Sequence, residues 1–251
     1  MRIAVLADIH GNLPALEAVL SHLDEQGGAD EIWVLGDHAV FCPYPAEVLE
    51  RLVALPRARF LQGNTDRYLV TGERPRWIAE DESQWKAMAA ALKERDANFR
   101  WTLERLTYEW YSFLRELPFL QRLNLDGYGT IIGVHASLAG DEAGIWADTT
   151  QPELRDLLAD TDARLLLCGH THHQLERWLG DVRVLNAGSV GSPLDGDQRA
   201  GYAILDLEDG DCRVAFHRVP YDVDEVIARL EEVGHPAREW VGARLRLAAH
   251  P

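Results

Sequence analysis

The amino-acid sequence predicts an α/β (α+β) fold in which two β-sheets pack face to face as a sandwich and helices flank them. Three observations support this prediction. The first sixty residues alternate short apolar runs with amphipathic helices, a helical segment follows, and the stretch after Pro118 is rich in strand-like runs. No repeat or linker divides the chain, so we expect one domain over residues 1–251 with a helical insert at about 73–116.

The N-terminal part predicts a β-α-β-α-β unit. Apolar runs at 3–7, 32–35 and 58–61 are typical of strands that are covered on both faces. Apolar side chains recur at helical spacing after the first run, and Pro45 is well placed to begin a second helix. Such units have parallel strands and right-handed crossovers, so the carboxyl ends of their strands meet at one edge of the sheet.

The insert is rich in Trp, Tyr, Arg and Glu and predicts helices at 83–95, 98–106 and 108–116. Two interpretations stay open: a structural wall packed on the sheet, or a cap beside a substrate cleft with Arg76 and Trp77 among its contacts. Beyond it, we expect one helix at 152–159, a helical tail at 222–249, and strands at 119–125, 130–134, 164–168, 174–178, 182–186, 201–207 and 212–219.

The charge balance limits the classes of partner. The net charge is −16, from 41 acidic and 25 basic side chains, which disfavours bulk nucleic-acid binding and binding to anionic membranes. A small phosphorylated substrate, including a nucleotide, stays compatible because divalent cations in a cleft reverse the local field. No apolar run reaches the length of a membrane span, no signal peptide is recognisable, and the cysteines form no CxxC pair, so we expect a cytoplasmic protein.

Metal-binding side chains follow several of the apolar runs. The set is Asp8, His10, Asp37, Asn64, His135, His170 and His172. Carboxylate, imidazole and amide donors without thiolate favour two divalent metal ions, with Mn²⁺ as first choice and Fe, Zn²⁺, Co²⁺ or Ni²⁺ as alternatives, over Mg²⁺ or a structural zinc. A two-metal site needs a bridging anion, for which Asp37 is the candidate. Glycine before Asp37, Asn64 and His170 is expected to allow a sharp turn there.

These segments match a family pattern. The pattern DxH, GD, GNH, H and GHxH corresponds here to Asp8-Ile9-His10, Gly36-Asp37, Gly63-Asn64-Thr65, His135 and Gly169-His170-Thr171-His172, and the stretch 186–191 is similar to NPGSVG. The chain therefore resembles the calcineurin-like metallophosphoesterase superfamily over about residues 3–193, with its bacterial phosphodiesterase-like branch most similar.

The resemblance implies a β-sandwich flanked by helices and a division of the ligands between two metals. One metal would be held by Asp8, His10, Asp37 and His172. The other would be held by Asp37, Asn64, His135 and His170. We also assign catalytic roles to Asp37, Asn64 and His135.

Thr65 departs from the family pattern. The family has a histidine there that protonates the leaving group or stabilises the transition state, so its absence disfavours hydrolysis of alkyl monoesters. His38, which follows Asp37, is a candidate replacement, and a structural role for it is the alternative.

The sequence thus predicts a metal-dependent phosphoester hydrolase, preferably a phosphodiesterase that uses a hydroxide bridging two metals. A dinucleoside polyphosphate hydrolase and a phosphomonoesterase remain alternatives within the same chemistry. A non-catalytic scaffold on the same fold is the rival from another class, although a scaffold has no need of a full ligand set.

Overall fold

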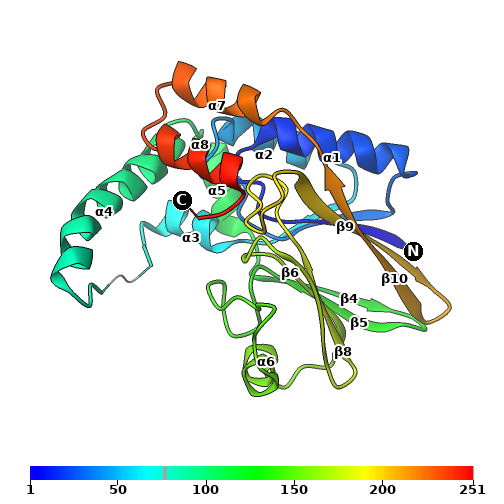
Figure 1. The fold of residues 1–251 in the computed structure, drawn as a ribbon. Coiled ribbons are helices and arrows are strands. Elements are labelled where there is room, and N and C mark those ends of the chain that lie inside the picture. Colours follow the sequence, from blue (N-terminus) through cyan, green and yellow to red (C-terminus); the bar gives the residue numbers. More distant parts are fainter. Residues whose placement is uncertain (76–77, 251) are drawn as a thin grey trace.

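Two five-stranded sheets face each other in the computed structural model, which describes residues 1–75 and 78–250 (Figure 1). The first sheet has the order β10-β9-β1-β2-β3, with β1 (Arg2–Leu6), β2 (Glu31–Val34), β3 (Ala58–Phe60), β9 (Ala200–Glu208) and β10 (Asp211–Val219). The second has the order β4-β5-β6-β8-β7, with β4 (Leu120–Leu125), β5 (Gly129–Val134), β6 (Ala163–Cys168), β7 (Gln174–Leu179) and β8 (Val182–Ala187).

Both sheets are mixed, and each contains three neighbouring parallel strands. β1, β2 and β3 run parallel, as do β5, β6 and β8, while β4, β7, β9 and β10 pair antiparallel. The parallel strands carry their carboxyl ends to a shared edge, as the sequence predicted. This edge is where polar side chains can gather without disturbing the apolar interior.

The apolar core lies between the sheets. Ile3, Val5 and Leu205 of the first sheet belong to one buried cluster with Ile131, Leu165 and Leu167 of the second. Trp33 is fully buried in this layer, and a Cβ on Gly133 would lie 2.9 Å from two carbons of its ring. The indole therefore requires a glycine on the facing strand, which fixes how closely the sheets approach.

Helices cover the outer faces of the sheets. α1 (Leu13–Glu25) and α2 (Pro45–Val53) pack on the first sheet, and α6 (Gln151–Leu158) packs on the second. The side chain of Asn12 accepts a hydrogen bond from the Ala15 N–H and so caps α1 directly after the first strand. The chain is thereby turned back within a few residues of the end of β1.

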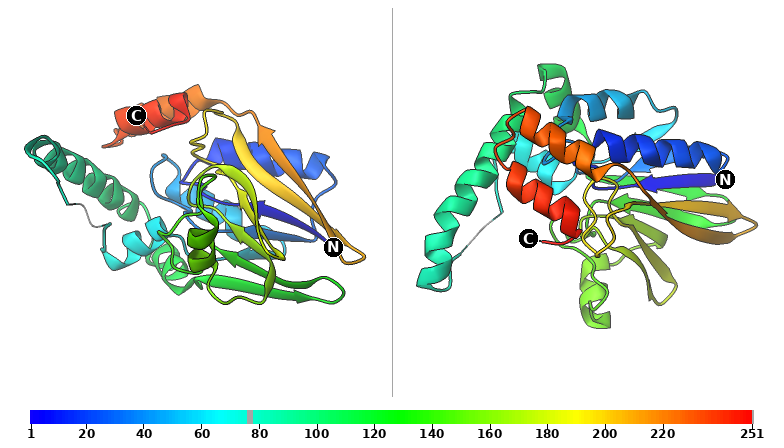
Figure 2. Two further views of the ribbon diagram at one scale, coloured as in Figure 1. Left: turned by 60° about the horizontal axis from the view of Figure 1, so that its bottom comes forward. Right: turned by 45° about the horizontal axis from the view of Figure 1, so that its top comes forward.

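The sequence did not indicate one helix that precedes the insert, and within the insert one long helix replaces two expected ones. α3 (Asn64–Thr71) follows β3, and α5 (Tyr108–Glu116) has the predicted bounds. The helices expected at 83–95 and 98–106 are one helix, α4 (Glu82–Leu103), because no glycine or proline interrupts it. Its first half projects from the body (Figure 2), and its last turns bury Phe99. Arg76 and Trp77 lie outside the described residues.

The tail forms two helices rather than one continuous segment. α7 (Val223–Glu232) and α8 (Arg238–Leu247) are separated where Gly234 has a φ of +60° and Pro236 follows. They pack on each other and on Cys42. None of the described helices combines the length and apolar content that a membrane span requires.

Trp33→Ala tests the sheet interface. We expect a loss of about 3–5 kcal/mol in the free energy of unfolding, because the substitution leaves a large cavity between the sheets. Trp178→Ala is the matched control, since that indole is 51% exposed and its loss should change stability by less than about 1 kcal/mol. Urea titration measures both variants, and equal losses would show that Trp33 does not hold the sheets together.

Candidate metal centre

All seven predicted ligands converge at the shared edge of the two sheets. Asp8 and His10 follow β1, and Asp37 follows β2. From the second sheet, His135 follows β5 while His170 and His172 follow β6; Asn64 opens α3. The side chains therefore come from both sheets and from one helix, so the centre forms only when the sandwich is assembled.

The backbone is strained at five of these seven positions. The φ angles are +55° at Asp8, +53° at His10, +56° at Asp37, +69° at His170 and +60° at His172. Residues with a side chain rarely adopt this left-handed region, and each instance costs roughly 1–3 kcal/mol. The His10 N–H donates to the Asp37 carbonyl at 2.9 Å, which holds two of the strained turns together. Strain gathered in this way is typical of functional sites.

The glycines beside the ligands serve two different needs. Gly36 has a φ of +88°, which confirms the predicted sharp turn before Asp37. Gly63 has an ordinary φ of −93°, but a Cβ there would lie 2.2 Å from Asp37 Oδ1. At Gly63 the prediction of a sharp turn was wrong: the glycine allows close approach of Asp37 instead.

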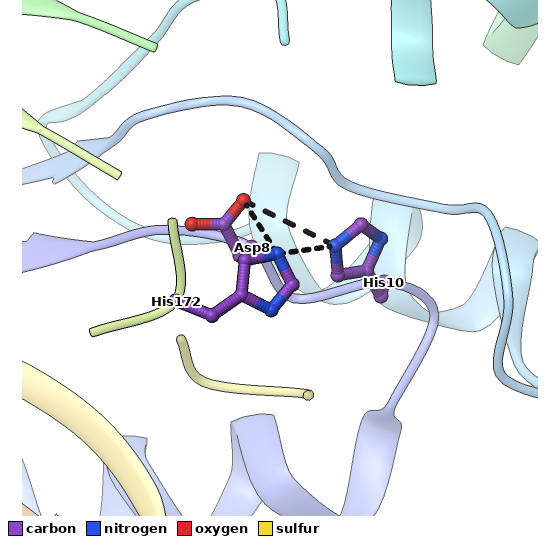
Figure 3. A group of neighbouring side chains, drawn as sticks. All are labelled: Asp8, His10 and His172. Carbon is purple, nitrogen blue, oxygen red and sulfur yellow. Dashed lines mark hydrogen bonds and ion pairs between the residues drawn. The ribbon is translucent and has the colours of Figure 1, made fainter. Parts of the chain in front are cut away.

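One group consists of Asp8, His10 and His172, whose side chains point toward one another in Figure 3. His10 Nε2 lies 3.2 Å from His172 Nε2, and His172 Nε2 lies 3.4 Å from Asp8 Oδ1. Two imidazole nitrogens and a carboxylate oxygen thus face one small volume. Three donors that face one small volume in this way form a candidate cation site.

A second group consists of Asn64, His135 and His170. Asn64 Oδ1 lies 2.8 Å from His135 Nε2 and 3.0 Å from His170 Nδ1. The two ring nitrogens are 3.3 Å apart. This group has the same character as the first, with an amide oxygen in place of the carboxylate.

Asp37 lies between the two groups. Its Oδ2 is 3.7 Å from His10 Nε2, and its Oδ1 is 3.6 Å from His135 Nε2. The two oxygens of one carboxylate therefore face different groups, which is the placement that a bridging ligand needs. Asp8 also comes within 4.8 Å of Asp37 and His135, a proximity that the sequence did not indicate.

The donor set fits divalent cations. The Nδ1 atoms of His10 and His135 lie 3.0 Å and 2.8 Å from the carbonyls of Val40 and Leu35, and His172 Nδ1 contacts the Ser192 carbonyl. A carbonyl only accepts, so each Nδ1 carries a proton, and each Nε2 can present a lone pair inward when its ring is neutral. Asp8 Oδ1 is buried without a hydrogen-bond partner among the described residues, as expected of an oxygen that awaits a cation.

Burial sets the protonation of the centre. It raises the pKa of Asp37 to about 6, with the carboxylates of Asp66 and Asp8 adding to the shift. It lowers the pKa of His170 to about 4 and that of His10 well below its usual range. Burial also opposes protonation of His135, but the carboxylates of Asp37 and Asp8 outweigh it and raise the pKa of that ring. His10 and His170 are therefore neutral near pH 7, the form that binds metals.

His38 is placed away from solvent. Its ring is fully buried, and its Nδ1 lies 2.8 Å from Asp66 Oδ2. Asp66 also accepts the backbone N–H groups of Asp37, His38 and Gly63 at 2.9–3.0 Å. The His38–Asp66 pair thus fixes the turn that carries Asp37. This placement favours a structural role for His38 over a role as replacement for the family's histidine.

Thr65 is held beside the second group. Its N–H donates to Asp37 Oδ1 at 2.9 Å, and its hydroxyl is buried with no partner among the described residues. A threonine hydroxyl is a poor acid at neutral pH, so the position supplies no proton comparable to that of an imidazole.

Arg244 of α8 reaches the centre, although the sequence reasoning passed over it. Its Nε donates to Ser192 Oγ at 2.7 Å, and one terminal nitrogen lies 3.4 Å from His172 Nδ1. Burial lowers the pKa of this guanidinium to about 10. The sequence does contain a signal for this residue. Arg244 lies on the same face of α8 as the apolar residues Val241 and Leu245, which are buried, so its side chain could have been expected to point into the protein.

Comparisons with known proteins show the family of this chain and its fold. The sequence profile of the calcineurin-like phosphoesterase superfamily domain matches residues 1–210. An uncharacterised protein of Methanocaldococcus jannaschii is 30% identical over 98% of this chain and 97% of its own. A crystal structure of a metallophosphoesterase from Sphaerobacter thermophilus superposes with a TM-score of 0.76 at 29% identity, over 99% of both chains. A hypothetical protein from Pyrococcus horikoshii OT3 shares the fold, with a TM-score of 0.76, 23% identity, and coverage of 99% of this chain and 98% of that one.

Asp37→Asn tests whether one carboxylate serves both groups. We expect the variant to lose both metal ions under conditions that saturate the wild-type protein, because an amide is a weaker bridge than a carboxylate. His135→Ala should retain one ion, and Asp181→Asn, at an exposed turn, should retain two. Elemental analysis of the purified proteins gives the metal content, and two ions in Asp37→Asn would exclude the bridging role.

Proposed function

The chain belongs to the calcineurin-like phosphoesterase superfamily and is a hydrolase of the metallophosphoesterase type, and from that premise we propose that it is a phosphodiesterase with a two-metal centre. The observation that carries the proposal is the position of Asp37, whose two carboxylate oxygens face separate groups of ligands. Such an arrangement suits two cations about 3.5–4 Å apart, the separation found in two-metal hydrolases.

Each part of the centre has a role in this proposal. Asp8, His10 and His172 hold one cation, Asn64, His135 and His170 hold the other, and Asp37 is shared. Bound cations would stabilise negative charge on the phosphoryl oxygens and lower the pKa of an attacking water. The backbone carbonyls fix the histidine rings by accepting their Nδ1–H groups, so the donors need little reorganisation when a substrate binds.

We propose Mn²⁺ as the working metal, with Fe, Zn²⁺, Co²⁺ and Ni²⁺ as alternatives. Imidazole, carboxylate and amide donors support this range, whereas Mg²⁺ and a closed structural zinc site are disfavoured. The three cysteines are buried and belong to none of the ligand groups. Activity of the metal-depleted protein after addition of each metal in turn identifies the best one.

The proposed substrates are phosphodiesters, anhydrides or aryl esters with acidic leaving groups. Thr65 offers no proton comparable to the family's histidine, and His38 is buried against Asp66. Without a general acid, a leaving group must depart as an anion, which disfavours alkyl monoesters. A dinucleoside polyphosphate also meets this requirement and remains an alternative. A scaffold function finds less support, because the full set of ligands is present and strained into place.

Thr65→His tests the substrate class. Wild-type protein should hydrolyse bis(4-nitrophenyl) phosphate faster than an alkyl monoester such as glycerol phosphate. The substitution should raise alkyl monoester turnover by up to about 10²–10⁴-fold, the usual contribution of general acid catalysis. Thr65→Gln is the control, since it adds a similar bulk without an acid. Faster turnover of the monoester than of the diester by wild type would contradict the argument from Thr65.

A further inference from the structure

A cavity of about 380 Å³ adjoins the metal centre. It lies among α3, the second half of α4, the start of α8 and the loop that carries Phe41. Asn64 and Thr65 form part of its wall, and Asn64 Oδ1 also contacts His135 Nε2 at 2.8 Å. Only the side chain of Asn64 therefore separates a phosphoryl group at the centre from this cavity. The volume of the cavity is in the range that holds small ligands.

Four aromatic side chains line the cavity, together with polar residues that include Glu94 and Arg95. Phe41 and Trp240 form one pair with ring centroids 5.5 Å apart, and Tyr68 and Phe99 form another at 6.1 Å. The rings of each pair are inclined to each other, by 59° and 75°, so several ring faces and edges border the same space. Flat apolar walls of this kind bind planar groups by stacking and exclude water from them.

Polar atoms without partners border the same cavity. Asn98 is 2% exposed, yet its Oδ1 has no hydrogen-bond partner in the part of the chain that the structure describes. The same holds for Thr65 Oγ1 and for Arg95 Nε, whose nearest carboxylate oxygen, on Asp96, is 3.7 Å away. A buried amide without a partner destabilises a protein, so such groups are usually satisfied by a ligand or water.

We propose that this cavity binds the nucleobase of a nucleoside phosphodiester. A planar heterocycle matches the aromatic walls, and its ring nitrogens and exocyclic groups match the amide of Asn98, since asparagine can donate and accept at a base edge at once. An acyl chain would fill the apolar volume but leave the Asn98 amide unsatisfied. The inference rests on the proposed function in one respect, namely that the phosphate of the ligand binds at the metal centre. The binding of the base is inferred from the cavity alone.

Direct binding of adenosine to the full-length, Mn²⁺-loaded protein separates the two claims, because adenosine contains no phosphate. Titration calorimetry should detect binding of adenosine but none of ribose. Asn98→Leu should weaken adenosine binding about tenfold or more, the effect of losing a paired base contact. Asn98→Asp, which keeps the shape but loses the amide donor, provides a second variant if the first is unstable. Lys93→Leu, exposed on the same helix, is the control and should bind like wild type.

Kinetics complete the test with two esters that share one leaving group. Asn98→Leu should raise KM for thymidine 5′-(4-nitrophenyl phosphate) at least about tenfold and leave methyl 4-nitrophenyl phosphate unchanged. Equal losses on both esters, with an unaltered thermal midpoint, would overturn the base pocket, as would binding of a fatty acid in place of adenosine. If wild type hydrolyses both esters but binds no nucleoside, the base pocket fails and the phosphodiesterase proposal stands. If wild type binds adenosine but hydrolyses neither ester, the phosphodiesterase proposal fails and the base pocket stands.

Discussion

The burial of two carboxylates among imidazole side chains is the constraint on which this structure depends. Asp8 and Asp37 are almost fully removed from water, and the groups that face them at ion-pair distance in the described chain are histidines rather than lysine or arginine. Such an arrangement is unfavourable unless a positive charge completes it. The strained turns, the closely approaching glycines and the hydrogen bonds from the rings to carbonyls all hold this group of side chains in position. We therefore infer that the fold is adapted to hold a cation there.

The two sheets make this arrangement possible. The seven ligand candidates come from the ends of strands in both sheets and from the start of α3. Facing sheets bring His135 and His170 opposite Asp8 and Asp37, and Trp33 against Gly133 sets the distance between the layers. The packing of the core and the geometry of the centre are thus coupled. A change in the distance between the sheets at Trp33 would also change the distances between the ligand side chains.

The sequence predicted the parts that depend on local signals. Apolar runs followed by Asp, Asn or His located the seven ligand candidates, and the parallel order of those strands placed the candidates at one edge. It did not predict that α4 is continuous, although no glycine or proline separates the two helices expected there. Arg244 and Asn98 escaped notice for another reason. Their significance comes from what lies opposite them, and contacts across 70 residues or between separate helices leave no mark in local patterns.

Thr65 connects the chemistry of the centre with the cavity beside it. In the family's pattern this position holds a histidine that acts on the leaving group, whereas here a small side chain borders the aromatic cavity. Losing the imidazole removes a proton donor, but it also leaves space next to Asn64 for a bulky part of the substrate. On the proposed function, an enzyme built in this way would depend on binding energy from the cavity to position its substrate rather than on proton transfer to expel the leaving group. On this view, threonine at position 65 does not inactivate the site. It means that substrate binding in the cavity contributes more to catalysis, and proton transfer at the metal centre contributes less.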